Sequence, residues 1–431
     1  MLENQILDIQ TVTAKMKADS YKMAALSIET RNSILKNVKE ALVNNKEEIF
    51  RANQMDLVAA EENGITAAVK KRLKFDESKL KDVTQGIEEL IKLEDPIGKT
   101  QFKRQLDEGL ILHRVSCPIG VIGIIFEARP DALVQISSLC IKSGNCAVLK
   151  GGKETTHTNS VLFEIIYQTA VKWGAPEACM FQAKLHSEID ELLACHKSVD
   201  LLIPRGSNQF VQYIMNHTKI PVMGHADGIC HTYLDRDADF TKAVSIIVDA
   251  KTQYTAACNS TETLLVDRAI EKETLKMIAK KLQEKNVVLH GTDEVSKVIA
   301  CEIMEEEDFN REYLDLEISI KYVDGVSEAI EHINRFGSHH TDCIITENRD
   351  TAETFMQYVD SAGTYLNCST RFADGFRYGF GAEVGISTSK IHARGPVGLE
   401  GLTTYKYKLY GDGHIVDDYA KGNRKFSFKE L

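Results

Sequence analysis

The sequence predicts an α/β protein with two successive modules, each a parallel sheet flanked by helices, and three observations lead to this prediction. First, residues 1 to about 93 carry apolar side chains at helical spacing, as in Ile34, Leu35, Val38, Ala41 and Leu42. Second, short β-branched runs further along alternate with segments of helical length, a rhythm typical of βαβ units. Third, residues 107–115 alternate around a Glu-Gly turn, which predicts a β-hairpin.

The expected strands fall into two groups on either side of residue 256. The first group comprises residues 121–126, 147–150, 201–204 and 220–223, and the second comprises 263–266, 287–290, 318–323, 342–346 and 363–367. Two α/β modules that meet near residue 256 are the economical interpretation. A crevice between two such modules is where we expect ligands to bind.

The chain of 431 residues has a formal net charge of −11, with 43% hydrophobic and 27% charged residues. Nucleic-acid-binding proteins need a basic face, so this charge argues against that class. An anionic small substrate is compatible with it, because a pocket can be locally basic. The N-terminus, MLENQILDIQ, lacks the regions of a signal peptide, and no apolar run is long enough to span a membrane. We expect a soluble cytoplasmic protein whose ten cysteines are mostly free thiols.

The most informative segment is residues 251–266, KTQYTAACNSTETLLV. Cys258 lies there in a loop of small and hydroxyl-bearing residues between an expected helix and an expected strand, which favours an exposed thiol. The backbone N–H of Asn259, next to such a nucleophile, is a natural donor to an oxyanion. The alternative is that Cys258 is a small buried apolar residue, as most free cysteines are.

A second segment, residues 115–154, contains two expected strands and ends in a basic, glycine-containing loop. Gly151 and Gly152 would let the backbone approach a ligand closely, and Lys150 could neutralise a phosphate. Arg129 lies in the turn after the first strand, where it could face an anion. The alternative is an ordinary turn with solvated basic residues.

A third segment, residues 202–210, reads LIPRGSNQF. A strand ends here, Gly206 permits a tight turn, and Ser207 is expected to cap the next helix, whose N-terminus would be an anion site. The chain contains neither G-x-G-x-x-G after a strand nor G-x-x-x-x-G-K-[ST]. A nucleotide would therefore bind through another pattern.

The C-terminal stretch 367–406 is rich in glycine and arginine. Arg371, Arg377, His392 and Arg394 could hold a carboxylate or a phosphate, with solvated surface charge as the alternative. No metal site is expected. The Cys-His and His-His pairs of the chain are adjacent residues, whose side chains diverge on a strand or a helix.

Together these segments resemble the gamma-glutamyl phosphate reductases, also called glutamate-5-semialdehyde dehydrogenases, a branch of the aldehyde dehydrogenase superfamily. The resemblance runs from the N-terminal helices to about Tyr407. Its most specific pieces are PIGVIGIIFEARPD, LKGGKET, LIPRGSN, KTQYTAACNSTETLLV, GSHHTDCIITEN and IHARGPVGLEGLTTYK.

The resemblance implies NADPH-dependent reduction of L-glutamate 5-phosphate to L-glutamate 5-semialdehyde and phosphate, through a cysteine thioester, in proline biosynthesis. It implies that Cys258 is the nucleophile, with Asn259 beside it. The cofactor ribose would meet Lys150 near Gly151 and Gly152, and the pyrophosphate would meet Gly206 and Ser207. Candidates for substrate binding are Arg129, Arg371, His392 and Arg394.

The family fold implies two Rossmann-like parallel-sheet domains and a small β arm. Its parts would be a cofactor-binding domain (1–97 and 117–255), a catalytic domain (256–390), and an oligomerisation arm (98–116 and 403–431), with 391–402 returning to the cofactor domain. The arm implies a homo-oligomer. Because the chain lacks the kinase module of fused versions, a separate glutamate 5-kinase would supply the substrate.

One departure from the superfamily is informative. Oxidative aldehyde dehydrogenases carry a glutamate base in an E-L-G-G motif, but residues 223–235 here read MGHADGICHTYLD. Without a base that activates water, a thioester survives until hydride arrives, which favours acyl phosphate chemistry. Two alternatives are an ordinary aldehyde dehydrogenase that forms an acid, and a non-catalytic nucleotide-binding regulatory protein. The Cys258 loop argues against the second.

Overall fold

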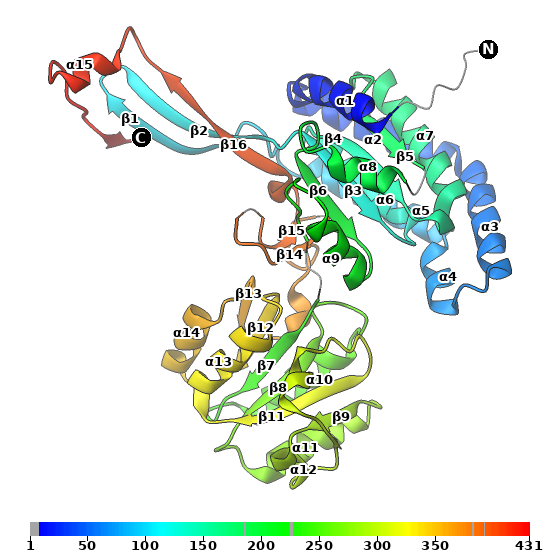
Figure 1. The fold of residues 1–431 in the computed structure, drawn as a ribbon, viewed down its shortest axis with the longest axis vertical. Helices are drawn as coiled ribbons and strands as arrows, with labels where there is room; N and C mark the ends of the chain where they lie inside the picture. The colour runs from blue at the N-terminus through cyan, green and yellow to red at the C-terminus, as the bar shows by residue number, and fades with distance from the viewer. Residues whose placement is uncertain (1–7, 185–186, 225–226, 382, 392) are drawn as a thin grey trace. The chain divides into compact units, whose positions relative to one another are not determined.

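The computed structural model describes residues 8–184, 187–224, 227–381, 383–391 and 393–431. It divides into two compact units (Figure 1). The first comprises Met1–Met223, Gly381–Gly385 and Val397–Leu431, and the second comprises Gly224–Phe380 and Ile386–Pro396. Each unit contains a parallel sheet with helices, so the predicted α/β fold class is confirmed.

The first unit is built on a four-stranded parallel sheet in the order β5-β4-β3-β6. Its strands are β3 (Val121–Phe126), β4 (Cys146–Gly151), β5 (Met180–Ala183) and β6 (Leu201–Arg205). Every residue of β3 is buried, as expected for a central strand of a parallel sheet covered on both faces. The carboxyl ends of β3, β4 and β6 therefore lie next to one another.

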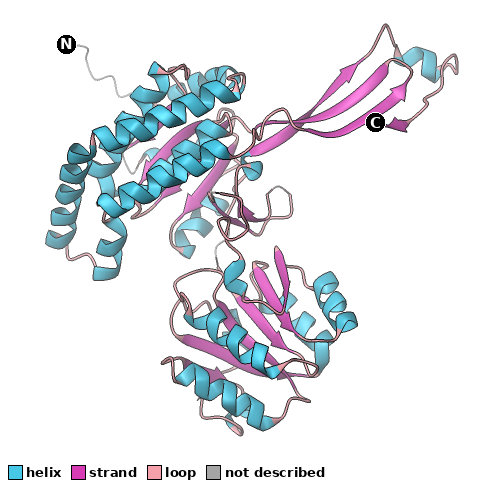
Figure 2. Ribbon diagram, turned by 180° about the vertical axis from the view of Figure 1, so that it is seen from behind, coloured by secondary structure: helices cyan, strands magenta, loops and turns pink. Residues whose placement is uncertain are grey.

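Helices surround this sheet (Figure 2). They are α1 (Ile9–Ala24), α2 (Ile28–Asn44), α3 (Lys46–Glu62), α4 (Ala67–Leu73), α5 (Glu77–Lys92), α6 (Pro130–Lys142), α7 (Thr156–Lys172), α8 (Glu188–Ala194) and α9 (Asn208–Asn216). Ser27 and Asp76 begin α2 and α5 as side-chain caps, which satisfy backbone N–H groups of the first turn. The predicted helical N-terminal region is thus confirmed.

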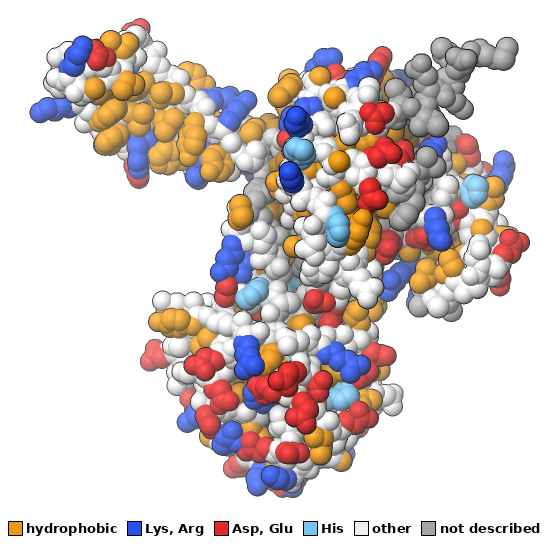
Figure 3. All heavy atoms as spheres, in the orientation of Figure 1, with side chains coloured by type: hydrophobic (Ala, Val, Ile, Leu, Met, Phe, Trp, Pro, Cys, Tyr) orange, Lys and Arg blue, Asp and Glu red, His pale blue; other side chains and the backbone are white. Residues whose placement is uncertain are grey.

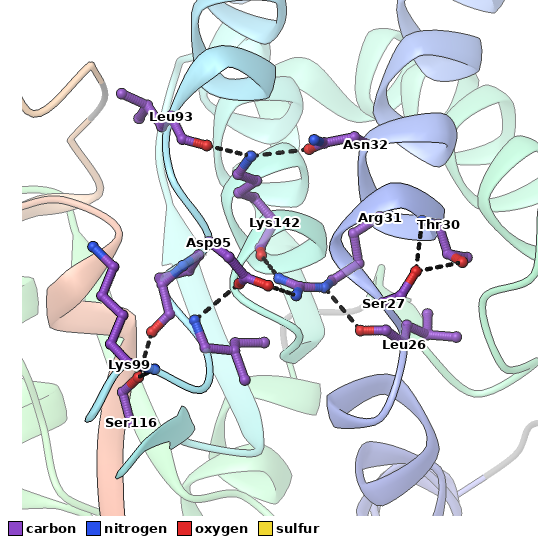
Figure 4. A network of polar contacts seen from close by, with 12 residues as sticks. Leu26, Ser27, Thr30, Arg31, Asn32, Leu93, Asp95, Lys99, Ser116 and Lys142 are labelled. Carbon is purple, nitrogen blue, oxygen red and sulfur yellow. Dashed lines mark hydrogen bonds and ion pairs between the residues drawn. The ribbon is translucent and has the colours of Figure 1, made fainter.

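A buried polar network ties α2 and α6 to the segment that leaves the helices (Figure 4). The Arg31 guanidinium is almost fully buried, pairs with Asp95 at 2.7 Å, and donates to the carbonyl oxygen of Lys142. The Lys142 ammonium donates in turn to the carbonyl oxygen of Leu93 at 2.8 Å and to the side chain of Asn32 at 2.9 Å. Burial, followed by the Arg31 charge, lowers the pKa of Lys142 to about 8.

A separate antiparallel sheet has the order β16-β2-β1-β17. It contains β1 (Thr100–Asp107), β2 (Leu110–Pro118), β16 (Thr403–Tyr410) and β17 (Lys429–Glu430), and a short helix, α15 (Val416–Ala420), lies between the last two strands in sequence. The predicted hairpin is confirmed: β1 and β2 are joined at Glu108 and Gly109, where Gly109 has φ +76°.

The second unit contains a seven-stranded sheet in the order β10-β9-β11-β8-β7-β12-β13. Its strands are β7 (Cys230–Leu234), β8 (Thr261–Asp267), β9 (Val288–Gly291), β10 (Glu302–Ile303), β11 (Glu317–Val323), β12 (Thr341–Ile345) and β13 (Gly363–Leu366). Its α-helices are α10 (Phe240–Thr252), α11 (Lys272–Gln283), α12 (Asp293–Ser296), α13 (Gly325–Phe336) and α14 (Arg349–Tyr358).

Side chains of this sheet alternate between two buried layers, as the two-residue period of a strand requires. Leu264 and Val266 of β8 pack in a core with α10 and α11, whereas Leu265 packs in a second core with α13 and α14. The same alternation holds along β12, where Ile345 joins the first core and Ile344 the second. Both faces of the sheet are therefore covered by helices.

Several sequence-based assignments differ from the structure. The first long segment of the first unit ends at Met223, so β7 and α10 belong to the second unit, although the sequence placed the division at 255–256. Residues 220–223 form only an isolated bridge, Leu202 with Val222. The strand β5 was not predicted, since its MFQA sequence is too short to give a hydrophobic pattern.

A small two-stranded sheet pairs β14 (Gly385–Ser387) with β15 (Gly395–Val397). Short 3-10 helices complete the fold at Lys153–Thr155, Glu306–Asn310, Thr370–Phe372 and Glu400–Leu402. Among the helices of the described part of the chain, none is long and apolar enough to cross a membrane.

Candidate active site

Cys258 lies in a tight turn between α10 and β8 of the second unit. The N–H of Ser260 donates to the carbonyl oxygen of Ala257 at 2.9 Å, which closes the turn around Cys258 and Asn259. The Ser260 hydroxyl reaches back to the carbonyl oxygen of Ala250 at 3.3 Å, near the end of α10. The thiol is partly exposed, as the sequence predicted.

The backbone of Cys258 is held from the other side by the chain that enters β7. A Cβ placed on Gly228 would lie 2.2 Å from the carbonyl oxygen and 2.4 Å from the Cα of Cys258, so only glycine fits there. The Gly228 N–H donates to Glu312 at 2.9 Å. Cys230, the first residue of β7, donates its S–H to the carbonyl oxygen of Cys258 at 3.2 Å.

The Cys258 sulfur has an imidazole partner. Nε2 of His340 lies 3.1 Å from Sγ of Cys258, within hydrogen-bonding distance for sulfur. The His340 side chain is fully buried, and its Nδ1 lies 2.9 Å from the Thr341 hydroxyl. A cysteine next to an imidazole is the arrangement that makes a thiol nucleophilic.

The topology of the sheet explains why His340 lies next to Cys258. Since β7 pairs with β8 on one side and with β12 on the other, all parallel, the amino ends of the three strands are neighbours (Figure 1). Cys258 precedes β8, and His340 directly precedes β12. The sequence did not predict His340 as a site residue. In the sequence His340 was considered only as part of an adjacent His-His pair that makes no metal site, and no local pattern marked it. In the structure its neighbour His339 has φ +60°, a conformation that marks a special turn.

Asn259 is 4% exposed, and its side chain donates to the carbonyl oxygen of Ala373 at 2.8 Å. The side chain of Asn259 therefore has a structural role. Within the described part of the chain, no residue accepts from the backbone N–H of Asn259. That N–H, beside the sulfur in sequence, is available to an oxyanion.

Arg371 belongs to the same unit as Cys258 and is 8% exposed. Its Nε donates to the side chain of Gln253 at 3.0 Å, and its carbonyl oxygen accepts from Arg377 at 2.6 Å. Burial lowers the pKa of Arg371, the Arg377 charge adds to this, and the Cys258 thiolate opposes it. The guanidinium and the sulfur thus act on each other electrostatically.

Arg394 also lies in the second unit, paired with an acidic partner. Its Nη2 donates to Oδ1 of Asp360 at 3.0 Å, while Lys390 contacts Oδ2 of the same carboxylate at 2.5 Å. The Lys390 hydrogen bond, opposed by burial and aided by Arg394, lowers the pKa of Asp360. His392, also predicted to bind the substrate, lies outside the described residues.

The predicted cofactor residues all lie in the first unit, at the carboxyl ends of adjacent strands. Lys150 and Gly151 end β4, Gly152 follows, and Gly206 follows β6. Lys150 is 6% exposed, and burial, opposed by Glu188 and Glu154, lowers its pKa. Its ammonium donates to the carbonyl oxygen of Gly151 at 2.8 Å, its only partner among the described residues. This edge is where parallel sheets bind nucleotides.

Two carboxylates that the sequence did not single out also lie at this edge. The N–H of Ser207, the residue before α9, donates to Glu127 at 3.3 Å, and Glu154 accepts from the N–H of Ala128 at 2.6 Å. Burial raises the pKa of Glu127, and the Glu154 charge adds to this. Ser207 is the predicted cap residue, although its hydroxyl makes no capping hydrogen bond.

Arg129, a predicted substrate-binding residue, belongs to the same unit as the cofactor candidates. It lies in the first unit as the residue before α6, whereas Arg371 and Arg394 lie in the second. Gly206 has no room for a side chain beside Glu127, since a Cβ would lie 2.7 Å from its carboxylate. Within the described ranges, no group of three or more His, Cys, Asp or Glu side chains could hold a metal ion.

The second unit therefore provides a partly exposed thiol, an imidazole against its sulfur, an available backbone N–H and a buried guanidinium. These groups suit attack on an acyl carbon, with stabilisation of the negative charge that develops. The first unit provides glycines, a lysine and a helix N-terminus at one sheet edge. These suit a phosphate-containing cofactor.

Comparison with known proteins agrees with this arrangement. A model of the aldehyde dehydrogenase family matches residues 4–306. Gamma-glutamyl phosphate reductase of Acetivibrio thermocellus is 53% identical over 425 residues, which covers 99% of both chains. A gamma-glutamyl phosphate reductase of Synechocystis is 52% identical over 424 residues, which covers 98% of both chains.

Among solved structures, gamma-glutamyl phosphate reductase from Thermotoga maritima superposes with a TM-score of 0.93 at 35% identity. It covers 95% of this chain and 99% of that chain. An engineered glycolyl-CoA reductase with bound NADP⁺ has a TM-score of 0.63 at 14% identity, with 92% of this chain and 95% of that chain covered. The second likeness concerns the fold alone.

Proposed function

Because the chain belongs to the gamma-glutamyl phosphate reductases of the aldehyde dehydrogenase family, an oxidoreductase family that uses nicotinamide cofactors, we propose that it reduces L-glutamate 5-phosphate to L-glutamate 5-semialdehyde and phosphate in proline biosynthesis. The observation that carries the proposal is the Cys258 turn, with its partly exposed thiol in contact with an imidazole.

In the first step the Cys258 thiolate attacks the acyl carbon of the substrate. A carbon–sulfur bond forms, and the negative charge moves to the carbonyl oxygen, where the N–H of Asn259 can donate to it. When this tetrahedral species collapses, phosphate leaves with the electron pair of the carbon–oxygen bond. The result is a thioester on Cys258.

The cations of the second unit fit the negative groups of this substrate. Arg371 is buried and electrostatically linked to Cys258, so we assign it to charge that develops close to the sulfur. Arg394 and Lys390 both contact the carboxylate of Asp360, and a carboxylate is the kind of group that we propose they hold in the substrate. We assign them to the amino-acid end of the substrate. Arg129 would act from the first unit.

We propose NADPH as the cofactor, held by the carboxyl edge of the first sheet. When bound, NADPH supplies the hydride that reduces the thioester to the aldehyde. The Lys150 ammonium has donors left for ribose hydroxyls, and the exposed Lys153 adds a second positive charge suited to the extra phosphate of NADPH. Gly151, Gly152 and Gly206 add no side chains of their own to that edge, which favours close approach of a pyrophosphate to the backbone. Bound NADP⁺ in the engineered relative of the same fold supports this choice.

The segment that enters β7 contains no glutamate like the base of oxidative aldehyde dehydrogenases, which also fits a reductase. The segment that enters β7 approaches the Cys258 backbone through Gly228, which carries no side chain. A base would accelerate hydrolysis of the thioester roughly 10²–10⁴-fold and waste it as an acid. We therefore favour the acyl phosphate reaction over oxidation of an aldehyde to an acid.

We further propose that the antiparallel sheet joins subunits into a homo-oligomer. β16 is an edge strand whose Tyr405, Tyr407 and Leu409 are exposed, and Figure 3 shows hydrophobic side chains gathered over this part of the first unit. Exposed edges of this kind pair with other strands unless they are covered. Light scattering of Tyr407→Glu should then show a smaller particle than the wild type.

We place the reaction in the cytoplasm, where a reducing environment keeps a catalytic thiol and the ten free cysteines reduced. A separate glutamate 5-kinase would supply the acyl phosphate. Because acyl phosphates hydrolyse readily in water, a kinase acting in the same compartment is the simplest source.

The proposal is tested by following NADPH oxidation with freshly generated glutamyl phosphate, for the wild type and for Cys258→Ala. We expect turnover in the wild type and none in the variant, together with an acyl adduct on Cys258 by mass spectrometry. Turnover by Cys258→Ala would contradict the covalent mechanism.

The reverse assay separates the reductase from an oxidative aldehyde dehydrogenase. Glutamate semialdehyde and NADP⁺ should react only when phosphate is present, because phosphate must release the thioester. Acid formation without phosphate would favour the oxidative alternative.

A further inference from the structure

The geometry points to His340 as a further catalytic residue, which takes the thiol proton of Cys258 and holds the sulfur as a thiolate in an imidazolium–thiolate pair. The observation is the 3.1 Å contact between Nε2 and Sγ. The inference deepens the proposed function, and its acyl-transfer step rests on that function. The contact itself does not depend on the identity of the substrate.

The fold holds the imidazole in one position. His340 is fully buried, its Nδ1 lies 2.9 Å from the Thr341 hydroxyl, and its carbonyl oxygen accepts from the N–H of Gly363 at 3.0 Å. The preceding residue, His339, has φ +60° and contacts the carbonyl oxygen of Asp360 through Nδ1 at 2.6 Å. Since Nδ1 lies next to the Thr341 hydroxyl, Nε2 is the ring nitrogen that faces Sγ of Cys258.

Formation of the Cys258 thiolate requires a positively charged neighbour. A free thiol titrates near pH 8.5 and a free imidazole near 6.5, so an isolated pair would hold its proton on nitrogen in only about 1% of molecules. Mutual attraction of the two charges at hydrogen-bonding distance raises this fraction, and a nearby guanidinium raises it further. Arg371, which interacts electrostatically with Cys258, supplies that second charge.

The proton and electrons balance over the cycle. The S–H bond breaks, its proton moves to Nε2 of His340, and the sulfur electron pair forms the bond to the acyl carbon. Phosphate leaves with the electrons of the carbon–oxygen bond. After hydride transfer the carbon–sulfur bond breaks, and its electron pair returns to Sγ as a thiolate opposite the imidazolium. His340 thus stabilises the sulfur both as nucleophile and as leaving group.

Other titratable and charged groups surround the pair and enter its pH dependence. They are Cys230 and the His231–Asp342 pair on neighbouring strands, His339 beside Asp360, Glu312 at the Gly228 amide, and Arg371 with Arg377. Cys230 is fully buried, and burial raises its pKa well above the ordinary value. It is therefore a neutral donor and does not compete as a nucleophile.

The test is the rate of alkylation of Cys258 by iodoacetamide as a function of pH, read from its peptide by mass spectrometry, in the full-length wild type and His340→Gln. Near pH 7 we expect alkylation of Cys258 to be roughly 10–100-fold slower in the variant, because loss of the imidazole leaves less of the thiol as thiolate. The rate profile of the variant should rise at higher pH than that of the wild type.

The same digest contains matched controls. Cys117 and Cys301 are partly exposed and distant in sequence from the site, so their alkylation should be equal in both proteins. Cys146 and Cys343 are fully buried, and their protection shows that the variant is folded. If His340→Gln is folded and alkylates at Cys258 with the wild-type rate and pH profile, the proposal is wrong, even if turnover falls.

Turnover gives the second readout. In His340→Gln we expect kcat with glutamyl phosphate and NADPH to fall roughly 10²–10⁴-fold with little change in KM, as for loss of a general base. Slow alkylation of the variant, combined with a wild type that does not turn over this substrate, would reject the proposed substrate and retain the role of His340. The role of His340 and the proposed substrate can therefore be contradicted independently of each other.

Discussion

Lys251 and Glu262 form an ion pair with both side chains fully buried, at 2.7 Å between Nζ and Oε2, on the two elements that flank the Cys258 turn. Lys251 lies in the last turn of α10, and Glu262 lies at the start of β8. Burial raises the pKa of Glu262 to about 7, although the Lys251 charge opposes this. The pair therefore connects α10 to β8 on either side of the turn that carries Cys258.

Removal of one partner of this ion pair should therefore lower the free energy of unfolding. Lys251→Met leaves a buried carboxylate without its counter-charge, and we expect the free energy of unfolding to fall by about 3–5 kcal/mol. The double variant Lys251→Met/Glu262→Leu should recover a large part of this loss, because no lone charge remains. Urea unfolding of both variants measures the difference. Equal stability of Lys251→Met and the wild type would show that the pair contributes nothing.

Gly228→Ala should disable the site without touching a catalytic atom. The added Cβ would lie 2.2 Å from the carbonyl oxygen of Cys258, so the turn must move. A shift of about 1 Å at a reacting group can cost about 10²-fold in rate, and we expect a fall in kcat of that order. Gly86→Ala is the matched control, because a Cβ there meets nothing within 4 Å and α5 should gain stability. Full activity in Gly228→Ala would contradict the close approach.

The buried His332 should make the second unit sensitive to acid. Burial, followed by the charges of His231, Lys321 and Arg335, lowers its pKa from 6.5 to about 2. Between these values the unfolded chain binds a proton that the folded protein cannot, so stability is lost as the pH falls below about 6.5, by up to about 1.4 kcal/mol per pH unit. The unfolding free energy of the wild type minus that of His332→Phe should fall as the pH is lowered below about 6.5. A difference that stays constant would exclude this role.

Lys142 should make the stability of the protein depend on pH in the alkaline range. Its pKa in the folded protein is about 8, against 10.5 for the free side chain, so the unfolded state binds more protons between these values. Its burial penalty is therefore present below about pH 8 and is relieved as the pH rises to about 10.5. The stability of the wild type relative to Lys142→Met should increase over that window. At neutral pH the variant should lose about 1–3 kcal/mol, because the carbonyl oxygens of Ile91 and Leu93 lose their donor.

Local pattern was sufficient to predict much of the fold. A β-branched run identified β3, alternation identified the β1–β2 hairpin, and helical spacing identified the N-terminal helices, because each of these patterns can be read from neighbouring residues. The strand β7 was missed, since its sequence CHTYL mixes polar with apolar residues, yet every residue is buried. Its polar side chains have partners far away in sequence: Nδ1 of His231 lies 3.1 Å from Oδ1 of Asp342, and the Thr232 hydroxyl lies 2.9 Å from that of Thr261.

The sequence by itself determined the α/β architecture, the family, and the exposure of Cys258, because short loops of small residues and alternating strands are local properties of the chain. Only the tertiary structure decided what surrounds that sulfur. His340 and Gly228 come to Cys258 because β7 lies between β8 and β12 in a parallel sheet, and strand order is set by long-range packing that no local pattern encodes. The imidazole that we infer to activate the thiol, 82 residues away, could be found only in three dimensions.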